Sequence, residues 1–174
     1  MPTAARMTAV TTARWLEGDE VRLWRAFIEV ASVLLADLDG ELQADHGLTL
    51  GDYEVLVVLS EAPGHAMRMC DLAERLRLSP SGLTRRLDGL VRDQVVRRMP
   101  APDDRRVNLA QLTDHGFERL AAAAPDHVAG VRRHMLDHLT DGQITLLADS
   151  FTALLAARQA ERAQRAADET PRRR

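Results

Sequence analysis

The basic residues of this chain are concentrated in one stretch. Residues 75–106 contain nine Arg and four Asp, so this segment carries a net charge of +5. The whole chain has 174 residues and a formal net charge of −3, which leaves −8 on the remainder. Guanidinium groups donate paired hydrogen bonds to phosphate oxygens and to guanine edges. A basic patch on an acidic body therefore predicts a face that binds a polyanion, with a solvated charged surface as the alternative.

The first candidate contact surface is a short helix within this basic stretch. Leu83, Leu87 and Leu90 recur at helical spacing over residues 80–93 and predict one buried side. Small side chains near its start would let this recognition helix approach base edges, and Arg85, opposite the leucines, could read a guanine. An ordinary surface helix is the alternative interpretation. The candidate contacts are Ser79, Ser81, Gly82, Thr84, Arg85 and Arg86.

The second candidate contact surface is a hairpin, or wing, that follows this helix. Two strands are predicted over residues 95–99 and 107–112, joined by a turn-forming loop rich in Pro and Asp. An Arg at a narrow loop tip can enter the minor groove. Asp104 would repel phosphate unless its carboxylate orients an Arg through a charge-assisted pair. The alternative interpretation of the whole loop is a charged surface that contacts only solvent. The candidate contacts on the wing are Arg97, Arg98, Asp104, Arg105 and Arg106.

The elements before the recognition helix are also predicted to be mostly helical. Apolar residues at three- and four-residue steps indicate a long amphipathic helix over residues 18–45. Thr and Asp at positions 49 and 52 are typical of a capping box, which opens a second helix that stops at Pro63-Gly64. A short extended piece over 65–69 and a short helix over 70–77 follow.

Start signals and periodicity place the remaining helices. Ser79 before Pro80 indicates the N-cap and first position of the recognition helix. A long helix is expected over 113–139, with a kink at Pro125 because proline lacks the N–H that the helix needs. A second capping box, at 140–143, opens a last helix that we expect to end near residue 165.

These elements predict a fold that is mainly α with a small β-hairpin wing: a winged helix-turn-helix flanked by N- and C-terminal dimerisation helices. The outer helices carry more apolar surface than a small DNA-binding unit can bury, so a second copy is the expected partner. The predicted divisions are a flexible segment (1–16), a dimerisation helix (17–46), the winged helix-turn-helix domain (47–113), the C-terminal dimerisation helices (114–166) and a disordered tail (167–174).

Composition excludes several other classes of protein. A single cysteine, Cys70, rules out a disulfide framework and a cysteine-rich zinc module. There is no apolar run long enough for a membrane span and no charged-then-apolar signal pattern, so we expect a cytoplasmic protein without a membrane partner. We find no Gly-rich phosphate loop, nucleophile elbow or well-spaced metal ligands, so an enzyme is not expected, nor a cofactor.

The stretch LSPSGLTRRLDGLVRDQVVRRMPAPDDRRVNLAQLTDHG resembles the core of the MarR family of bacterial regulators. Its wing motif corresponds to Asp104, Arg106, Leu112, Thr113 and Gly116. The resemblance covers roughly residues 18–165. It implies a dimer formed through the first helix and the last two helices, a recognition helix in the major groove, and repression of target genes. It also implies that Arg106, with Arg105 beside it, reaches the minor groove.

The same resemblance suggests where an effector would bind, between the dimerisation helices and the winged unit. A urate-responsive branch of the family points to Trp15, Glu54 (where that branch has Asp) and Arg86, and the candidate pocket is Trp15, Trp24, Glu54 and Arg86. Dimer packing is the preferred role for the two Trp. Peroxide-sensing members use a Cys near the first helix, which is missing here, so we expect Cys70 to be a buried small residue. A zinc-sensing role for His127, His134 and His138 is a lesser alternative to a solvated face.

The sequence thus predicts a DNA-binding transcriptional repressor. We expect it to bind an inverted repeat in double-stranded DNA as a homodimer, with release by a small-molecule effector. A helical interaction module that no longer binds DNA is the alternative, and exposed arginines at 85, 105 and 106 would argue against it.

Overall fold

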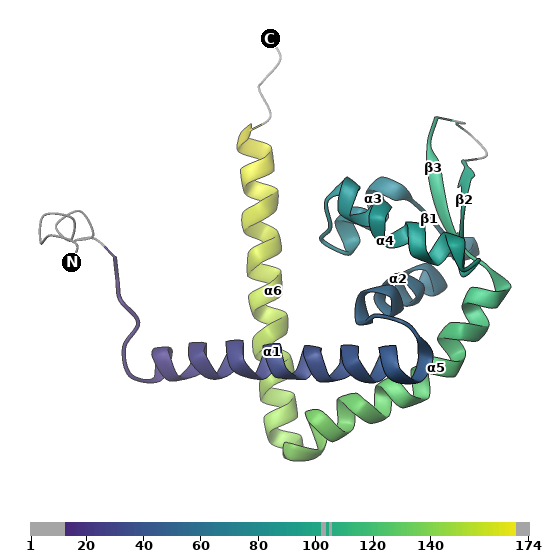
Figure 1. Cartoon of the computed structure of the whole chain (residues 1–174). Coiled ribbons are helices and arrows are strands. Elements are labelled where there is room, and N and C mark those ends of the chain that lie inside the picture. Colours follow the sequence, from purple (N-terminus) through teal and green to yellow (C-terminus); the bar gives the residue numbers. More distant parts are fainter. Residues whose placement is uncertain (1–12, 102–103, 105, 170–174) are drawn as a thin grey trace, which may run out of the picture.

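The computed structural model describes residues 13–101, 104 and 106–169. The long helix α1 (Asp19–His46) runs beneath a compact unit built from α2, α3, α4 and three strands (Figure 1). Helix α5 leads away from that unit under α1, and α6 then crosses α1 and continues beyond it, on the same side of α1 as that unit (Figure 1). The predicted class, mainly helical with a winged helix-turn-helix in the middle, is confirmed.

Local capping signals set the first two helix boundaries. Helix α1 ends where Gly47 adopts a left-handed conformation, φ 63°, with its N–H directed at the carbonyls of Leu42 and Gln43. Helix α2 (Leu50–Glu61) opens with the predicted capping box, because the Thr49 side chain accepts the Asp52 N–H and the Asp52 carboxylate accepts the Thr49 N–H. That prediction is confirmed.

The winged unit consists of two short helices and a small sheet. A 3-10 turn, η3 (Pro63–His65), leads into β1 (Ala66–Arg68), which is followed by α3 (Met69–Arg75) and α4 (Pro80–Arg92). Strands β2 (Val96–Pro100) and β3 (Asn108–Leu112) form the wing. All pairing is antiparallel in the order β1-β3-β2, so β1 adds a third strand to the predicted hairpin.

One hydrophobic core fixes the orientation of α4. Leu83 and Leu87 on α4 are fully buried against Leu56 and Leu59 of α2 and Leu72 of α3. Burying a leucine side chain contributes about 1.5–3 kcal/mol. Because the leucines of α4 occupy this core, the opposite side of the helix must face outward.

The C-terminal helices differ from the sequence prediction in two boundaries: α5 ends earlier than expected, and α6 continues to Glu169, so residues 167–169, expected in a disordered tail, are helical. Helix α5 (Asp114–His134) stays helical through Pro125, and Figure 1 shows it bending along its length. It ends at His134 rather than at Leu139, because Met135 leaves the helical region with φ −136° and ψ −64°. A 3-10 turn, η4 (Leu136–His138), then leads to α6 (Asp141–Glu169), which the predicted Thr140–Gln143 capping box opens.

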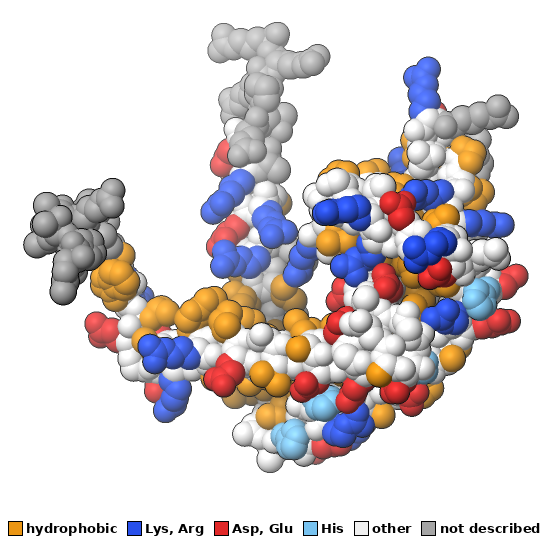
Figure 2. All heavy atoms as spheres, viewed as in Figure 1, with side chains coloured by type: hydrophobic (Ala, Val, Ile, Leu, Met, Phe, Trp, Pro, Cys, Tyr) orange, Lys and Arg blue, Asp and Glu red, His pale blue; other side chains and the backbone are white. Residues whose placement is uncertain are grey.

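The outer helices α1 and α6 expose a continuous set of large apolar side chains. Phe27 of α1 contacts Phe151 of α6, with ring centroids 6.0 Å apart, so the two helices share one apolar surface. Figure 2 shows this surface as a hydrophobic band along α1. We call it the outer apolar face, and its exposed members are Leu23, Trp24, Phe27, Ile28, Val30, Val33, Leu35, Leu146, Phe151, Leu154 and Leu155.

Within the described residues, no helix has the length and apolar character needed to cross a bilayer.

Candidate nucleic-acid interface

Helix α4 presents a polar, small-residue surface at its N-terminal end. The Ser79 hydroxyl accepts the Gly82 N–H at 3.1 Å, which confirms the predicted N-cap. Ser81, Thr84 and Arg85 are all exposed. Thr84 donates its hydroxyl to the Pro80 carbonyl at 2.9 Å, so its methyl group and Arg85 are the outward groups on this turn. This surface could enter a major groove.

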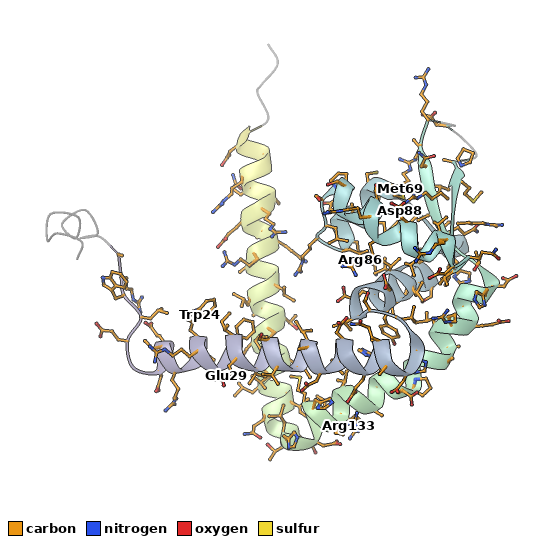
Figure 3. The ribbon with its side chains drawn as sticks, in the orientation of Figure 1. Trp24, Glu29, Met69, Arg86, Asp88 and Arg133 are labelled. Atoms are coloured by element: carbon orange, nitrogen blue, oxygen red, sulfur yellow. The ribbon has the colours of Figure 1, made fainter. Side chains whose placement is uncertain are left out.

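Arg85 and Arg86 are neighbours in sequence but serve different surfaces. Arg85 is exposed, whereas Arg86 is half-buried and turns toward the start of α2. Its guanidinium lies so close to Gly51 that a Cβ built there would stand 1.4 Å from Arg86 Nη1. Figure 3 labels Arg86 between α4 and α2. Of the two, Arg85 is the side chain with free access to DNA.

The two arginines of β2 are held by other parts of the winged unit. Arg97 donates from Nε to the Gln111 side chain of β3 at 2.8 Å. Arg98 donates to the Asp88 carboxylate at 2.7 Å and to the Thr84 carbonyl at 3.0 Å, both on α4. Arg98 therefore joins the wing to the recognition helix. The sequence predicts both arginines as DNA contacts and gives no sign of Asp88 as a partner, because the two segments are ten residues apart and meet only in the folded unit.

The wing tip is shaped by Asp104. Its carboxylate accepts the backbone N–H of Arg106 at 2.9 Å, and its carbonyl accepts the Val107 N–H at 2.9 Å. The expected charge-assisted pair with a guanidinium is not formed among the described residues; the carboxylate instead fixes the backbone of a turn. Arg106 is exposed, and Arg105 lies outside the described residues. Figure 2 shows blue side chains concentrated over the winged unit.

Comparison with known proteins decides the family. The MarR family model matches residues 48–107. The transcriptional repressor YetL of Bacillus subtilis is 32% identical over 114 residues, covering 64% of this chain and 68% of that protein. The MarR family regulator AbsC of Streptomyces coelicolor superposes with a TM-score of 0.79 and 39% identity, covering 85% of this chain and 99% of AbsC. This chain belongs to the MarR family. A second regulator of that family from Streptomyces coelicolor, Sco3205, was solved in complex with DNA; its TM-score is 0.79, with 36% identity over 83% of this chain and 91% of Sco3205.

The MarR wing motif has a structural explanation in this chain. Thr113 caps α5 by accepting the Gly116 N–H at 2.9 Å, and its hydroxyl donates to the Gln94 carbonyl at 2.8 Å. A Cβ at Gly116 would stand 2.1 Å from the Val95 carbonyl oxygen, so only glycine fits there. Leu112 is buried. The motif thus joins the wing to α5 and shapes its tip.

The four residues proposed for the effector pocket of this MarR-family chain do not meet within one chain. Trp15 and Trp24 are exposed, and Trp24 lies toward the N-terminal end of α1, far from Arg86 (Figure 3). Arg86 and Glu54 belong to the α4–α2 side of the winged unit. A cavity of about 130 Å³ lies elsewhere, between α1 and α5; Glu41, Asp45, His46, Asp126, His127 and Arg133 are among its lining residues.

The structure tests the expectations about Cys70 and about the three histidines His127, His134 and His138. The expectation that Cys70 is buried is wrong: it is exposed on the first turn of α3, where its thiol lies 3.2 Å from Asp71. His134 hydrogen-bonds Glu41 of α1 at 2.7 Å instead of joining His127 and His138. The described residues contain no cluster of three metal-ligating side chains.

Sequence reasoning missed the charged contacts between α1 and α5. Glu41 accepts hydrogen bonds from both His134 and Arg133, and these two partners lower the pKa of its carboxyl. His127 stacks on Tyr53 of α2, with ring centroids 4.4 Å apart. Its Nδ1 is buried and has no hydrogen-bond partner in the described part of the chain, and burial lowers the pKa of this imidazole. The Glu41 contacts thus join α1 to α5, and the His127 contact joins α5 to α2.

Proposed function

We propose that this MarR-family regulator binds double-stranded operator DNA as a homodimer. The outer apolar face carries the proposal. Trp24 is 53% exposed, Leu146 66% and Leu154 56%, on two helices that already contact each other. A monomer would leave this surface in water, and exposed patches of this kind mark association sites. A second copy that contributes the same face buries both sets.

A two-fold dimer presents two recognition helices, and this supports an inverted repeat as the target. The two half-sites would lie about 10 base pairs apart, one turn of the duplex. Arg85 is the proposed base-reading side chain, together with Ser81 and Thr84. Arg106 is the proposed minor-groove contact, with the Asp104 turn setting its direction. Sco3205, which is 36% identical, was solved in complex with DNA, and this supports DNA as the partner.

We further propose that binding represses transcription and that a small molecule releases the protein. YetL, one of the relatives, is named a repressor. The position of Arg86 supports an effector site between α4 and α2, because its guanidinium fills the space beside Gly51 there. A ligand that displaced this side chain would act directly on the recognition helix. Trp24 lies on the outer apolar face, so a partner subunit would have to complete any pocket that uses it.

The test combines solution size with selection of DNA. Light scattering at micromolar concentration should give a dimer, and fragments selected from random DNA should contain an inverted repeat. A glutamate substitution at Leu154, on the outer apolar face, should yield a monomer with much weaker binding, whereas Leu154→Met, which keeps an apolar side chain there, should remain a dimer. A monomeric wild-type protein would refute the dimer. A dimer that selects no DNA would instead favour an interaction module.

A further inference from the structure

The turn between α3 and α4 contains an arginine with a left-handed backbone. Arg77 has φ 55°, and it directly follows the C-cap residue Leu76. The Leu78 N–H donates to the Ala73 backbone carbonyl at 2.9 Å, and the Arg77 N–H donates to the Glu74 backbone carbonyl at 3.0 Å. This pair of bonds is the Schellman end of a helix, in which the left-handed position is usually glycine or asparagine.

The fold requires this backbone conformation but does not require an arginine. Leu78 packs against the core, so its burial directs the chain through the left-handed turn. Any side chain with a Cβ is disfavoured there relative to glycine. The Arg77 side chain is exposed and forms no ion pair within the described part of the chain, whereas its neighbour Arg75 pairs with Glu61 at 2.9 Å. No side-chain contact among residues 13–101, 104 and 106–169 compensates for placing an arginine at this turn.

We propose that the Arg77 guanidinium binds a backbone phosphate of the DNA beside the recognition helix. Arg77 precedes the N-cap Ser79 by two residues, so it stands next to the end of α4 that would enter the major groove. When a recognition helix lies in the major groove of DNA, the sugar-phosphate backbone at the edge of the groove passes close to the turn before the helix. Phosphate contacts at this turn set the position of the helix. This inference rests on the proposed DNA-binding function and adds a residue that the wing and α4 do not include.

A second turn of the same type provides a matched control. Gln94 follows α4 with φ 57°, and the Val95 N–H donates to the Leu90 carbonyl at 2.9 Å. This turn lies at the opposite end of α4 and holds an uncharged residue. Asparagine tolerates the left-handed conformation, so Arg77→Asn and Gln94→Asn relieve the same backbone strain. Only the first substitution removes a cation.

The experiment measures unfolding temperature and operator affinity for the two Asn variants and for Arg77→Lys, across a range of salt concentrations. Both Asn variants should melt at or above the wild-type temperature. Arg77→Asn should reduce the salt slope of log K by about 0.9 per protomer, which amounts to roughly eightfold weaker binding per half-site at 0.1 M salt. The loss should be similar on random DNA. Arg77→Lys should keep the slope, and Gln94→Asn should bind like the wild type.

Each other outcome counts against a specific claim. If Arg77→Asn binds with wild-type affinity and slope, Arg77 does not contact phosphate. If it melts well below the wild type while Gln94→Asn does not, Arg77 has a structural role and the inference fails. If the wild-type protein itself binds no DNA, the proposed function fails, and that result is separate from both of these.

Discussion

The Arg98–Asp88 contact predicts that removing the negative charge of Asp88 weakens DNA binding, which is the opposite of what simple electrostatics predicts. Asp88 lies on the recognition helix, so replacing it with alanine removes a negative charge near the proposed DNA surface. Electrostatics alone predicts tighter binding. If the carboxylate instead holds Arg98, and through it the wing, the same change should weaken specific binding.

The size of the effect follows from the exposure of the pair. The side chain of Arg98 is 34% exposed and that of Asp88 58%, so solvent screens their attraction to about 0.5–1 kcal/mol. The hydrogen bond from Arg98 to the Thr84 carbonyl adds about 1 kcal/mol. We therefore expect Arg98→Ala to lower the free energy of unfolding by about 1–2 kcal/mol, and Asp88→Ala by about half of that.

The assay is a double-mutant cycle on one selected operator, measured by fluorescence anisotropy at fixed salt. Each single variant should bind about 2–5-fold more weakly, and the double variant should lose less than the product of the two losses. The salt slope should not change for Arg98→Ala, because the guanidinium is engaged within the protein. Tighter binding by Asp88→Ala, with independent effects in the double variant, would refute a positioning role. A reduced salt slope for Arg98→Ala would show that Arg98 contacts phosphate.

Three more perturbations test separate parts of the molecule. Arg85→Ala should cost about 1–3 kcal/mol on the operator and much less on random DNA in titrations at one salt concentration; equal losses would mean a phosphate contact only. Asp104→Ala should weaken operator binding, although it removes a negative charge, because it removes the acceptor that holds the turn presenting Arg106, whereas Asp104→Asn, which keeps an acceptor oxygen, should keep the turn; tighter binding by Asp104→Ala would show that the carboxylate is merely tolerated. His127 has a lowered pKa in the fold, so the unfolded chain takes up its proton first as the pH falls below about 6.5, and stability present above that pH is lost. Urea unfolding at pH 7.5 and pH 5.5 should show a smaller loss for His127→Phe, which keeps a ring against Tyr53; an equal loss would assign the effect to other groups.

Local signals made the boundaries of the winged unit predictable. The capping box at Thr49 and the Ser79-Pro80 start describe hydrogen bonds between residues close in sequence, and both occur as expected. The leucine spacing of α4 likewise determined which side is buried. The domain divisions and the individual DNA contacts remain predictions.

The features that sequence could not supply depend on contacts between distant segments. Arg97 and Arg98 are adjacent, yet strand alternation directs one to Gln111 and the other to α4, so only the sheet register separates their roles. Cys70 lies on the first turn of a seven-residue helix, too short for periodicity to indicate its buried side. Helix α5 ends at His134, whose side chain hydrogen-bonds Glu41 of α1, 93 positions earlier in the sequence. A contact between residues so far apart leaves no local pattern that could mark the end of the helix.

Helix α5 makes the geometry of DNA reading sensitive to small rotations. It is capped at the base of the wing by Thr113 and fixed to α1 at its far end by His134, 21 residues and about 31 Å of helix later. Tilting a rod of that length by about 10° moves one end by about 5 Å, comparable to the rise of a single helical turn. In the proposed dimer, two such helices related by symmetry would double the change in the distance between their ends. A rotation of a few degrees at the crossing of α1 and α5 would thus change the distance between the two recognition helices. That distance would then no longer match the spacing of successive major grooves on the duplex.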